Sequence, residues 1–77
     1  MKSIYSAEYK AVIDRVVAER KRRGITQVQL AETLGRPQSF VSKTESRERR
    51  LDIVEFFQIC RAMKANGVEL LRQAGIC

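Results

Sequence analysis

The sequence predicts an all-α protein in which five short helices pack into one compact domain. Apolar residues recur at helical spacing in five segments, and a start or stop signal accompanies each segment. No alternating strand pattern persists, and the only proline is Pro37. A length of 77 residues suits a single domain over residues 1–77, with its core at about residues 8–74.

The first helix is expected over residues 6–23 and is ended by Gly24. The cations from Arg20 to Arg23 fall in its last turn, where they offset the negative end of the helix dipole. A basic run that contacts DNA is the other interpretation of these cations. The apolar face of this first helix is formed by Tyr9, Val12, Ile13 and Val16.

The second helix is expected to begin at Gln27, because Thr26 and Gln29 form the pattern of a capping box. Gly35 follows its last apolar residue, where the chain needs a positive φ to turn away. The inward positions are Leu30, Ala31 and Leu34.

The third helix is expected over residues 38–45, after a turn at Arg36 and Pro37 that suits the start of a helix. Its inward residues are Phe40, Val41 and Thr44. Its outward residues are Gln38, Ser39, Ser42 and Lys43.

A fixed spacing links these two helices, carried by Gln27, Ala31, Gly35 and Val41. Ala31 is small where the two helices cross closely, and Val41 is the apolar anchor of an otherwise polar helix. A helix that is held at one buried point and is polar outside suits a DNA major groove. The spacing therefore predicts a helix-turn-helix.

Two further helices complete the expected fold. Asp52 and Glu55 form a capping pattern for a fourth helix that ends near Lys64, and its apolar residues are Ile53, Phe56, Phe57, Ile59, Cys60 and Met63. Asn66 begins a last short helix that Gly75 stops, with apolar residues Val68, Leu70 and Leu71.

The net charge is +6 and the pI is about 9.9. This balance favours an anionic partner, nucleic acid before a membrane surface, although many small proteins are basic for no specific purpose. The chain has no His and no dense cluster of Asp, Glu or Cys, so we expect no enzyme activity, no catalytic residues, no cofactor and no metal site.

No run approaches the ~18 apolar residues of a membrane span, and residues 1–10 lack a signal-peptide core. We therefore expect a cytoplasmic protein that does not bind membranes. Cys60 is expected in the core, and Cys77 is free to oxidise.

Residues 11–73 resemble the Cro/phage-repressor-like helix-turn-helix family, the xenobiotic-response-element-like regulators of bacteria and phages. The resemblance is carried by RGITQVQLAETLG at 23–35, PQSFVSKTE at 37–45 and RRLDI at 49–53. It implies a lambda-repressor-like DNA-binding domain. Three features depart from the family pattern: Thr44 replaces a larger apolar residue, residues 46–48 lack the usual glycine, and Lys64 stands where glycine often ends the fourth helix.

The resemblance implies that the third helix lies in the major groove, with Gln38, Ser39, Ser42 and Lys43 against base edges. Gln bonds well to adenine, Lys to guanine, and Ser to either. Either serine also fits a merely solvated position. Phe40 fits the core or a thymine methyl.

Phosphate contacts are expected from residues that flank the third helix: Gln27, Arg36, Arg47, Arg49 and Arg50. A simple capping role is the other interpretation of Gln27, and some of the four arginines fit solvated positions. The resemblance also implies a salt bridge between Arg20 and Glu45, against the alternative of two separate surface charges.

Family members usually bind inverted repeats as dimers, so a homodimer is expected. The candidate interface residues are Val68, Leu71 and Ile76, or Ile4 and Tyr5, unless these apolar residues only close the core. The main functional hypothesis is a transcriptional repressor. The alternatives are an antitoxin that binds a toxin protein and represses its own operon, and an interaction domain without DNA binding.

Overall fold

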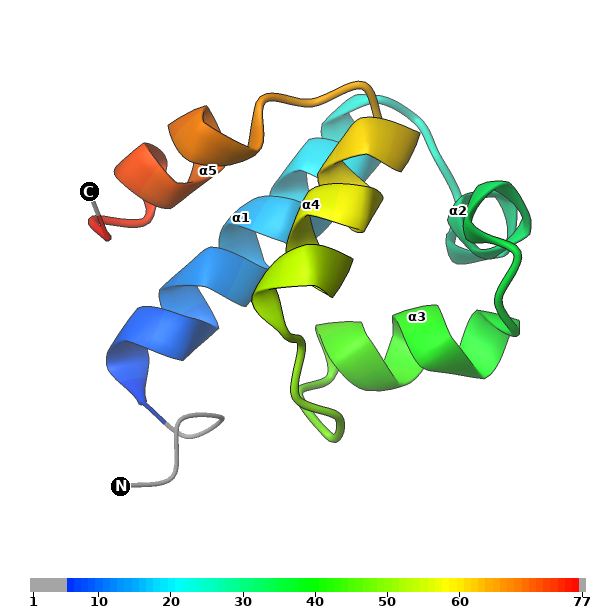
Figure 1. Ribbon diagram of the computed structural model, residues 1–77, viewed down its shortest axis with the longest axis horizontal. Helices are drawn as coiled ribbons and strands as arrows, with labels where there is room; N and C mark the ends of the chain where they lie inside the picture. Colours follow the sequence, from blue (N-terminus) through cyan, green and yellow to red (C-terminus); the bar gives the residue numbers. More distant parts are fainter. Residues whose placement is uncertain (1–5, 77) are drawn as a thin grey trace.

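The computed structural model describes residues 6–76, and this range contains five helices and no strand (Figure 1). The helices are α1 (Ala7–Arg22), α2 (Gln27–Leu34), α3 (Gln38–Glu45), α4 (Ile53–Ala62) and α5 (Gly67–Gln73). The predicted all-α fold of five helices is confirmed. The fourth helix ends slightly earlier than expected, and none of the helices in the described range is long and apolar enough to cross a bilayer.

The helix starts follow the sequence signals closely. The side chains of Thr26 and Asp52 each accept a hydrogen bond from the backbone N–H three residues on. The side-chain oxygens of Gln29 and Glu55 accept the backbone N–H of Thr26 and Asp52 in return, so both capping boxes are formed. Ser6 caps α1 through the N–H of Tyr9. Caps of this kind satisfy N–H groups that have no partner inside the helix, which is why the expected and observed starts agree.

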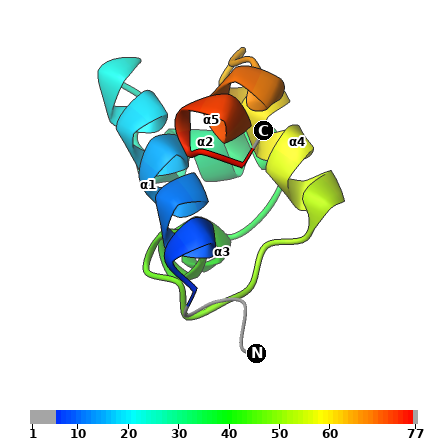
Figure 2. The same ribbon diagram turned by 90° about the vertical axis from the view of Figure 1, so that its left-hand side faces the viewer.

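The helices pack around a single core, with α2 and α3 at one end of the molecule and α5 at the other (Figures 1 and 2). α1 contacts α3 and α5, α2 contacts α3 and α4, and α4 contacts α5. Within the helix-turn-helix pair, α3 therefore packs against α1 and α2 packs against α4, and the outer face of α3 is left open.

Every helix contributes to the core, whose buried apolar residues are Ile13, Val16, Leu30, Ala31, Phe40, Val41, Leu51, Phe56, Ile59, Cys60, Met63 and Leu70. Cys60 is buried as expected, and burial raises the pKa of its thiol to about 11, so the thiol stays protonated at neutral pH. Ile53 fits the apolar pattern of α4 but is exposed, because it occupies the first position of the helix and points away from the core.

Two helices, α3 and α4, are each followed two residues later by a residue with an unusual backbone. Arg47 and Lys64 adopt φ values of 65° and 58°, in the left-handed region that normally favours glycine. Each supplies the turn of a Schellman motif: Glu48 N–H bonds to the carbonyl of Lys43, and Ala65 N–H bonds to that of Cys60. These are the positions where the sequence lacks the glycines of the family pattern. The chain therefore makes the same kind of turn with residues other than glycine.

Thr44 is buried on the inner face of α3, and its hydroxyl has no hydrogen-bond partner among the described residues. Thr44→Val is therefore expected to raise the free energy of unfolding by about 1 kcal/mol, because valine keeps the shape and removes the unpaired hydroxyl. Urea denaturation measures the change. Thr33→Val is the control, since the exposed Thr33 hydroxyl donates to the Gln29 carbonyl and its loss should stabilise nothing. Equal shifts for the two variants would contradict the prediction.

Candidate nucleic-acid interface

The open face of α3 carries all four residues expected to read bases. Gln38, Ser39 and Lys43 are exposed, and Ser42 is half-buried with its hydroxyl donating to the Ser39 carbonyl at 3.3 Å. The opposite face is buried through Phe40, Val41 and Thr44. Helical periodicity thus separates a polar surface from an apolar one on eight residues.

Phe40 packs in the core and lies beneath two guanidinium groups. It is buried, and the guanidinium carbons of Arg36 and Arg49 lie 4.3 and 4.6 Å from the centre of its ring. Of the two interpretations of Phe40, the structure therefore supports packing against the protein.

Arg20 and Glu45 join α1 to the end of α3. Arg20 donates from Nε and Nη2 to the two carboxylate oxygens of Glu45, at 2.6 and 2.9 Å, and both side chains are only 9% exposed. A third Arg20 nitrogen donates to the carbonyl of Ile25 at 2.8 Å. A bidentate pair at this depth fixes α3 against α1 through both charge and geometry.

Gln27 connects this ion pair to the open face of α3. Its amide nitrogen donates to Glu45 Oε1 at 2.9 Å, and its amide oxygen accepts from Gln38 Nε2 at 3.0 Å. Capping of α2 is performed by Thr26 and Gln29, so the Gln27 side chain does not serve as a cap. The Gln38 amide is thereby oriented while its oxygen and one N–H stay available for another partner.

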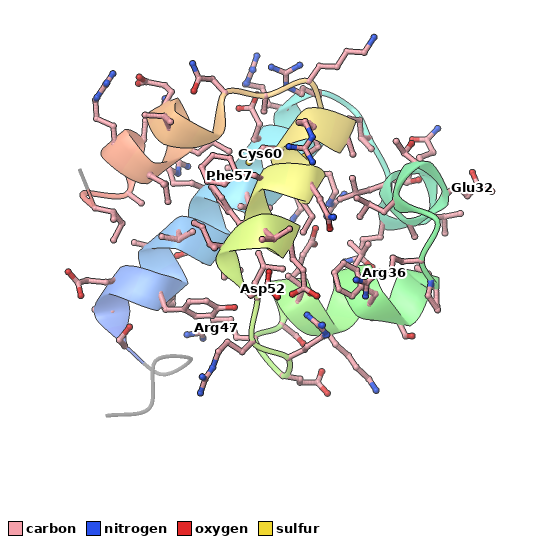
Figure 3. The ribbon with its side chains drawn as sticks, viewed as in Figure 1. Glu32, Arg36, Arg47, Asp52, Phe57 and Cys60 are labelled. Atoms are coloured by element: carbon pink, nitrogen blue, oxygen red, sulfur yellow. The ribbon has the colours of Figure 1, made fainter. Side chains whose placement is uncertain are left out.

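The four flanking arginines fall into two groups. Arg49 donates to both oxygens of Glu55 at 2.9 and 2.7 Å and to the Arg50 carbonyl at 3.0 Å, and Arg36 reaches Glu55 at 3.5 Å. Arg47 and Arg50 form no salt bridge with the residues that the structure describes. Arg47 projects from the connection between α3 and α4 (Figure 3).

Glu55 is the functional candidate that sequence reasoning missed. Its capping role was expected, but its pairing with two arginines across the α3–α4 turn was not. The hydrogen bonds from Arg49 lower the pKa of Glu55 to about 2, so the carboxylate is charged throughout the neutral range. The only sequence signal was one acidic residue close to several arginines.

The run from Arg20 to Arg23 serves the end of α1. Arg20 points inward to Glu45, and both Arg22 and Arg23 pair with Glu19. Hydrogen bonds from Arg22 and then Arg23 lower the pKa of Glu19 to about 2. Of the two interpretations of this run, the contacts favour a helix-terminal charge cluster.

The residues proposed for dimer contacts are only partly surface residues. Val68 and Ile76 are exposed, whereas Leu71 is half-buried and packs against the core. Ile4, Tyr5 and Cys77 lie outside the described residues.

Comparisons with known proteins agree with the helix-turn-helix fold of this chain. A family model described as helix-turn-helix matches residues 17–70. A solved structure of an XRE-family like protein from Pseudomonas syringae pv. tomato str. DC3000 is similar, with 49% sequence identity and a TM-score of 0.86. The similarity covers 90% of this chain and 84% of that one. A search of curated proteins found no match.

Proposed function

Because the chain belongs to the Cro/C1-type helix-turn-helix family, a class of DNA-binding transcriptional regulators, we propose that it is a repressor that binds an inverted-repeat operator as a dimer. The third helix, α3, enters the major groove and reads base edges. The observation that carries this proposal is the hydrogen bond from Gln38 to Gln27, which holds a reading side chain in one orientation. Repression follows from exclusion of polymerase from the occupied site.

Base reading is assigned to the open face of α3. The free oxygen and N–H of the Gln38 amide match the N6 and N7 atoms of adenine, and Lys43 matches the acceptors of guanine. Ser39 and Ser42 adapt to several bases because a hydroxyl both donates and accepts. Each well-formed contact of the bidentate kind is worth about 1–3 kcal/mol of discrimination.

Phosphate contacts set the position of α3 in the groove. Gln27 is the first residue of α2, where the helix dipole and free N–H groups favour an anion. Arg36, Arg47, Arg49 and Arg50 supply cations around the same face. These contacts displace counterions, so the affinity for DNA should fall steeply as salt rises.

Dimerisation is assigned to the α5 end of the domain, where Val68 and Ile76 are exposed at 51% and 43%. This end lies away from α2 and α3, so contact there leaves both reading faces free (Figures 1 and 2). Half-sites would then lie about one helical turn apart, ~10 base pairs. Sedimentation with and without operator DNA tests whether the dimer exists before binding.

In vitro selection from random duplex DNA near physiological salt tests the proposed function directly. Enrichment of an inverted repeat establishes specific reading by a bound dimer and gives the spacing of its half-sites. Salt-sensitive binding without any enriched sequence would contradict sequence-specific repression, and an acidic protein partner would then be the next target of search.

Gln38→Ala is expected to weaken binding to the selected site by about 1–3 kcal/mol and to relax preference at one base position. The reason is the loss of an oriented amide that both donates and accepts. Gln73→Ala is the matched control for base preference, because Gln73 is an exposed glutamine at the end of α5 and does not lie on the open face of α3. Unchanged discrimination in Gln38→Ala, measured by competition with single-base variants of the site, would show that the reading face is assigned incorrectly.

Arg47→Gly is expected to separate stability from DNA binding. Glycine relieves the left-handed backbone, so the free energy of unfolding should rise by about 1 kcal/mol. Loss of the cation should weaken all DNA sequences equally and flatten the salt slope by about one. Lys64→Gly is the control: it relieves the same kind of strain at the end of α4 and should leave DNA affinity unchanged. Equal DNA affinities for the two variants would remove Arg47 from the interface.

A further inference from the structure

Arg36, Arg49 and Glu55 form a cluster on the ring of Phe40, and its role extends the proposed function. We propose that Glu55 is a positioning residue for DNA binding: it holds the guanidinium groups of Arg36 and Arg49 beside the reading face of α3, where they meet phosphates of the duplex. This inference rests on the proposed function, because it assigns the two arginines to phosphate contact.

The Glu55 carboxylate is a fixed acceptor. It is buried in the first turn of α4, and its Oε1 also accepts the backbone N–H of Asp52 at 3.1 Å. The capping box ties it to the backbone, since Asp52 accepts the Glu55 N–H at 2.7 Å in return. Its orientation is therefore set by the start of a helix and does not depend on the arginines alone.

The two guanidinium groups are held on one side and open on the other. Their side chains are 42% exposed in Arg36 and 36% exposed in Arg49, although both contact Glu55 and the Phe40 ring. Five N–H donors on each guanidinium exceed the bonds that Glu55 and the Arg50 carbonyl accept. Two cations on one carboxylate also leave a net positive charge at the cluster.

The cluster lies on the edge of α3 opposite to Gln27. Phe40 is three residues from Lys43, so the two are neighbours on the surface of α3, whereas Gln38 bonds to Gln27 along the other edge. Arg36 lies beside α3 on the side toward α4 (Figure 3). A major groove has phosphates on both sides, so a reading helix needs contacts at both of its edges.

Positioning explains why a carboxylate is present near a surface that meets DNA. A lone carboxylate there repels phosphate. A carboxylate that orders two arginines in the folded protein means that the conformational entropy of their side chains is lost on folding and is not lost again on DNA binding. The two effects have opposite signs in a DNA-binding measurement, which makes them separable.

Glu55→Gln and Glu48→Gln, compared by DNA titration at several salt concentrations, test the proposal. Glutamine still completes the capping box at position 55. Glu48 lies in the α3–α4 turn, is exposed, and bonds to the Ser46 hydroxyl, so its substitution removes the same charge without releasing an arginine. Glu48→Gln should tighten binding by roughly twofold to threefold through charge alone. Glu55→Gln should weaken it by roughly fivefold and flatten the salt slope by about one.

The arginines themselves supply the second measurement. In a protein that already carries Arg36→Ala and Arg49→Ala, Glu55→Gln should tighten binding as Glu48→Gln does, because only its charge then remains. A purely structural role of Glu55 would weaken binding in both backgrounds and would leave the salt slope unchanged, which overturns the proposal.

Tighter binding by Glu55→Gln in the otherwise unchanged protein also overturns the proposal, because the carboxylate would then act only as a repulsive charge. This failure is distinct from that of the proposed function. If the unchanged protein selects no DNA sequence, the repressor assignment falls. If it selects a site and Glu55→Gln binds that site more tightly, only the positioning role falls. Thermal melts of each variant establish that the titrations compare folded proteins.

Discussion

Replacement of Glu45 by alanine is expected to lower the free energy of unfolding by about 3–5 kcal/mol. The substitution leaves the Arg20 guanidinium buried without its bidentate partner, and it also removes an acceptor for the Gln27 amide. A small domain has roughly 5–15 kcal/mol of total stability, so much of the protein should be unfolded at moderate temperature.

Glu48→Ala provides the matched comparison for this prediction. Glu48 is exposed and bonds to the Ser46 hydroxyl, so its loss should change stability by less than about 0.5 kcal/mol. Equal denaturation midpoints for the two alanine variants would show that the Arg20–Glu45 pair contributes nothing to the fold. The paired variant Arg20→Met with Glu45→Leu should be more stable than Glu45→Ala, because it leaves no buried charge unpaired.

Gly67→Ala is the second substitution with a large expected effect, a destabilisation of about 1–3 kcal/mol. A Cβ atom at Gly67 would lie 2.7 and 2.8 Å from two ring carbons of Phe57 and 3.2 Å from Cys60 Sγ. Phe57 and Cys60 are both on α4 (Figure 3), so the added methyl group would push α5 away from α4. Helix propensity alone predicts the opposite sign, since alanine is favoured over glycine in a helix.

The background variant Phe57→Leu separates these two effects. Leucine removes the ring atoms that the new methyl group would meet, so Gly67→Ala should be much less harmful in that background. A stabilising effect of Gly67→Ala in the unchanged protein, measured by urea denaturation, would mean that the Phe57 ring moves aside without loss. It would then be wrong to regard the approach of α5 to α4 as tight.

The sequence predicts this fold well because its signals are local. Capping patterns at Thr26 and Asp52 and apolar residues at helical spacing act within one or two turns, and each marks an element that the structure contains. Packing decides which apolar residues of an element are buried, and this is why Ile53 fits the pattern of α4 and is nevertheless exposed.

The contacts of the candidate interface are harder to predict because no local sequence pattern links the residues that they join. Arg20 and Glu45 are 25 positions apart, and only the family resemblance pointed to their pairing. The pairing of Arg49 with Glu55 depends on a turn in which Arg47 takes a conformation that its residue type disfavours. No local pattern indicates that geometry, so Glu55 could be recognised only as a capping residue.

Under the proposed base-reading role of Gln38, its hydrogen bond with Gln27 has a consequence for how target preference changes during evolution. A new side chain at position 38 leaves the Gln27 amide oxygen without its donor, so the effect of the change depends on what occupies position 27. Single substitutions at position 38 are therefore poor steps toward a new operator. Libraries that seek altered specificity should randomise both positions together, and paralogues with different targets should differ at the two sites as a pair.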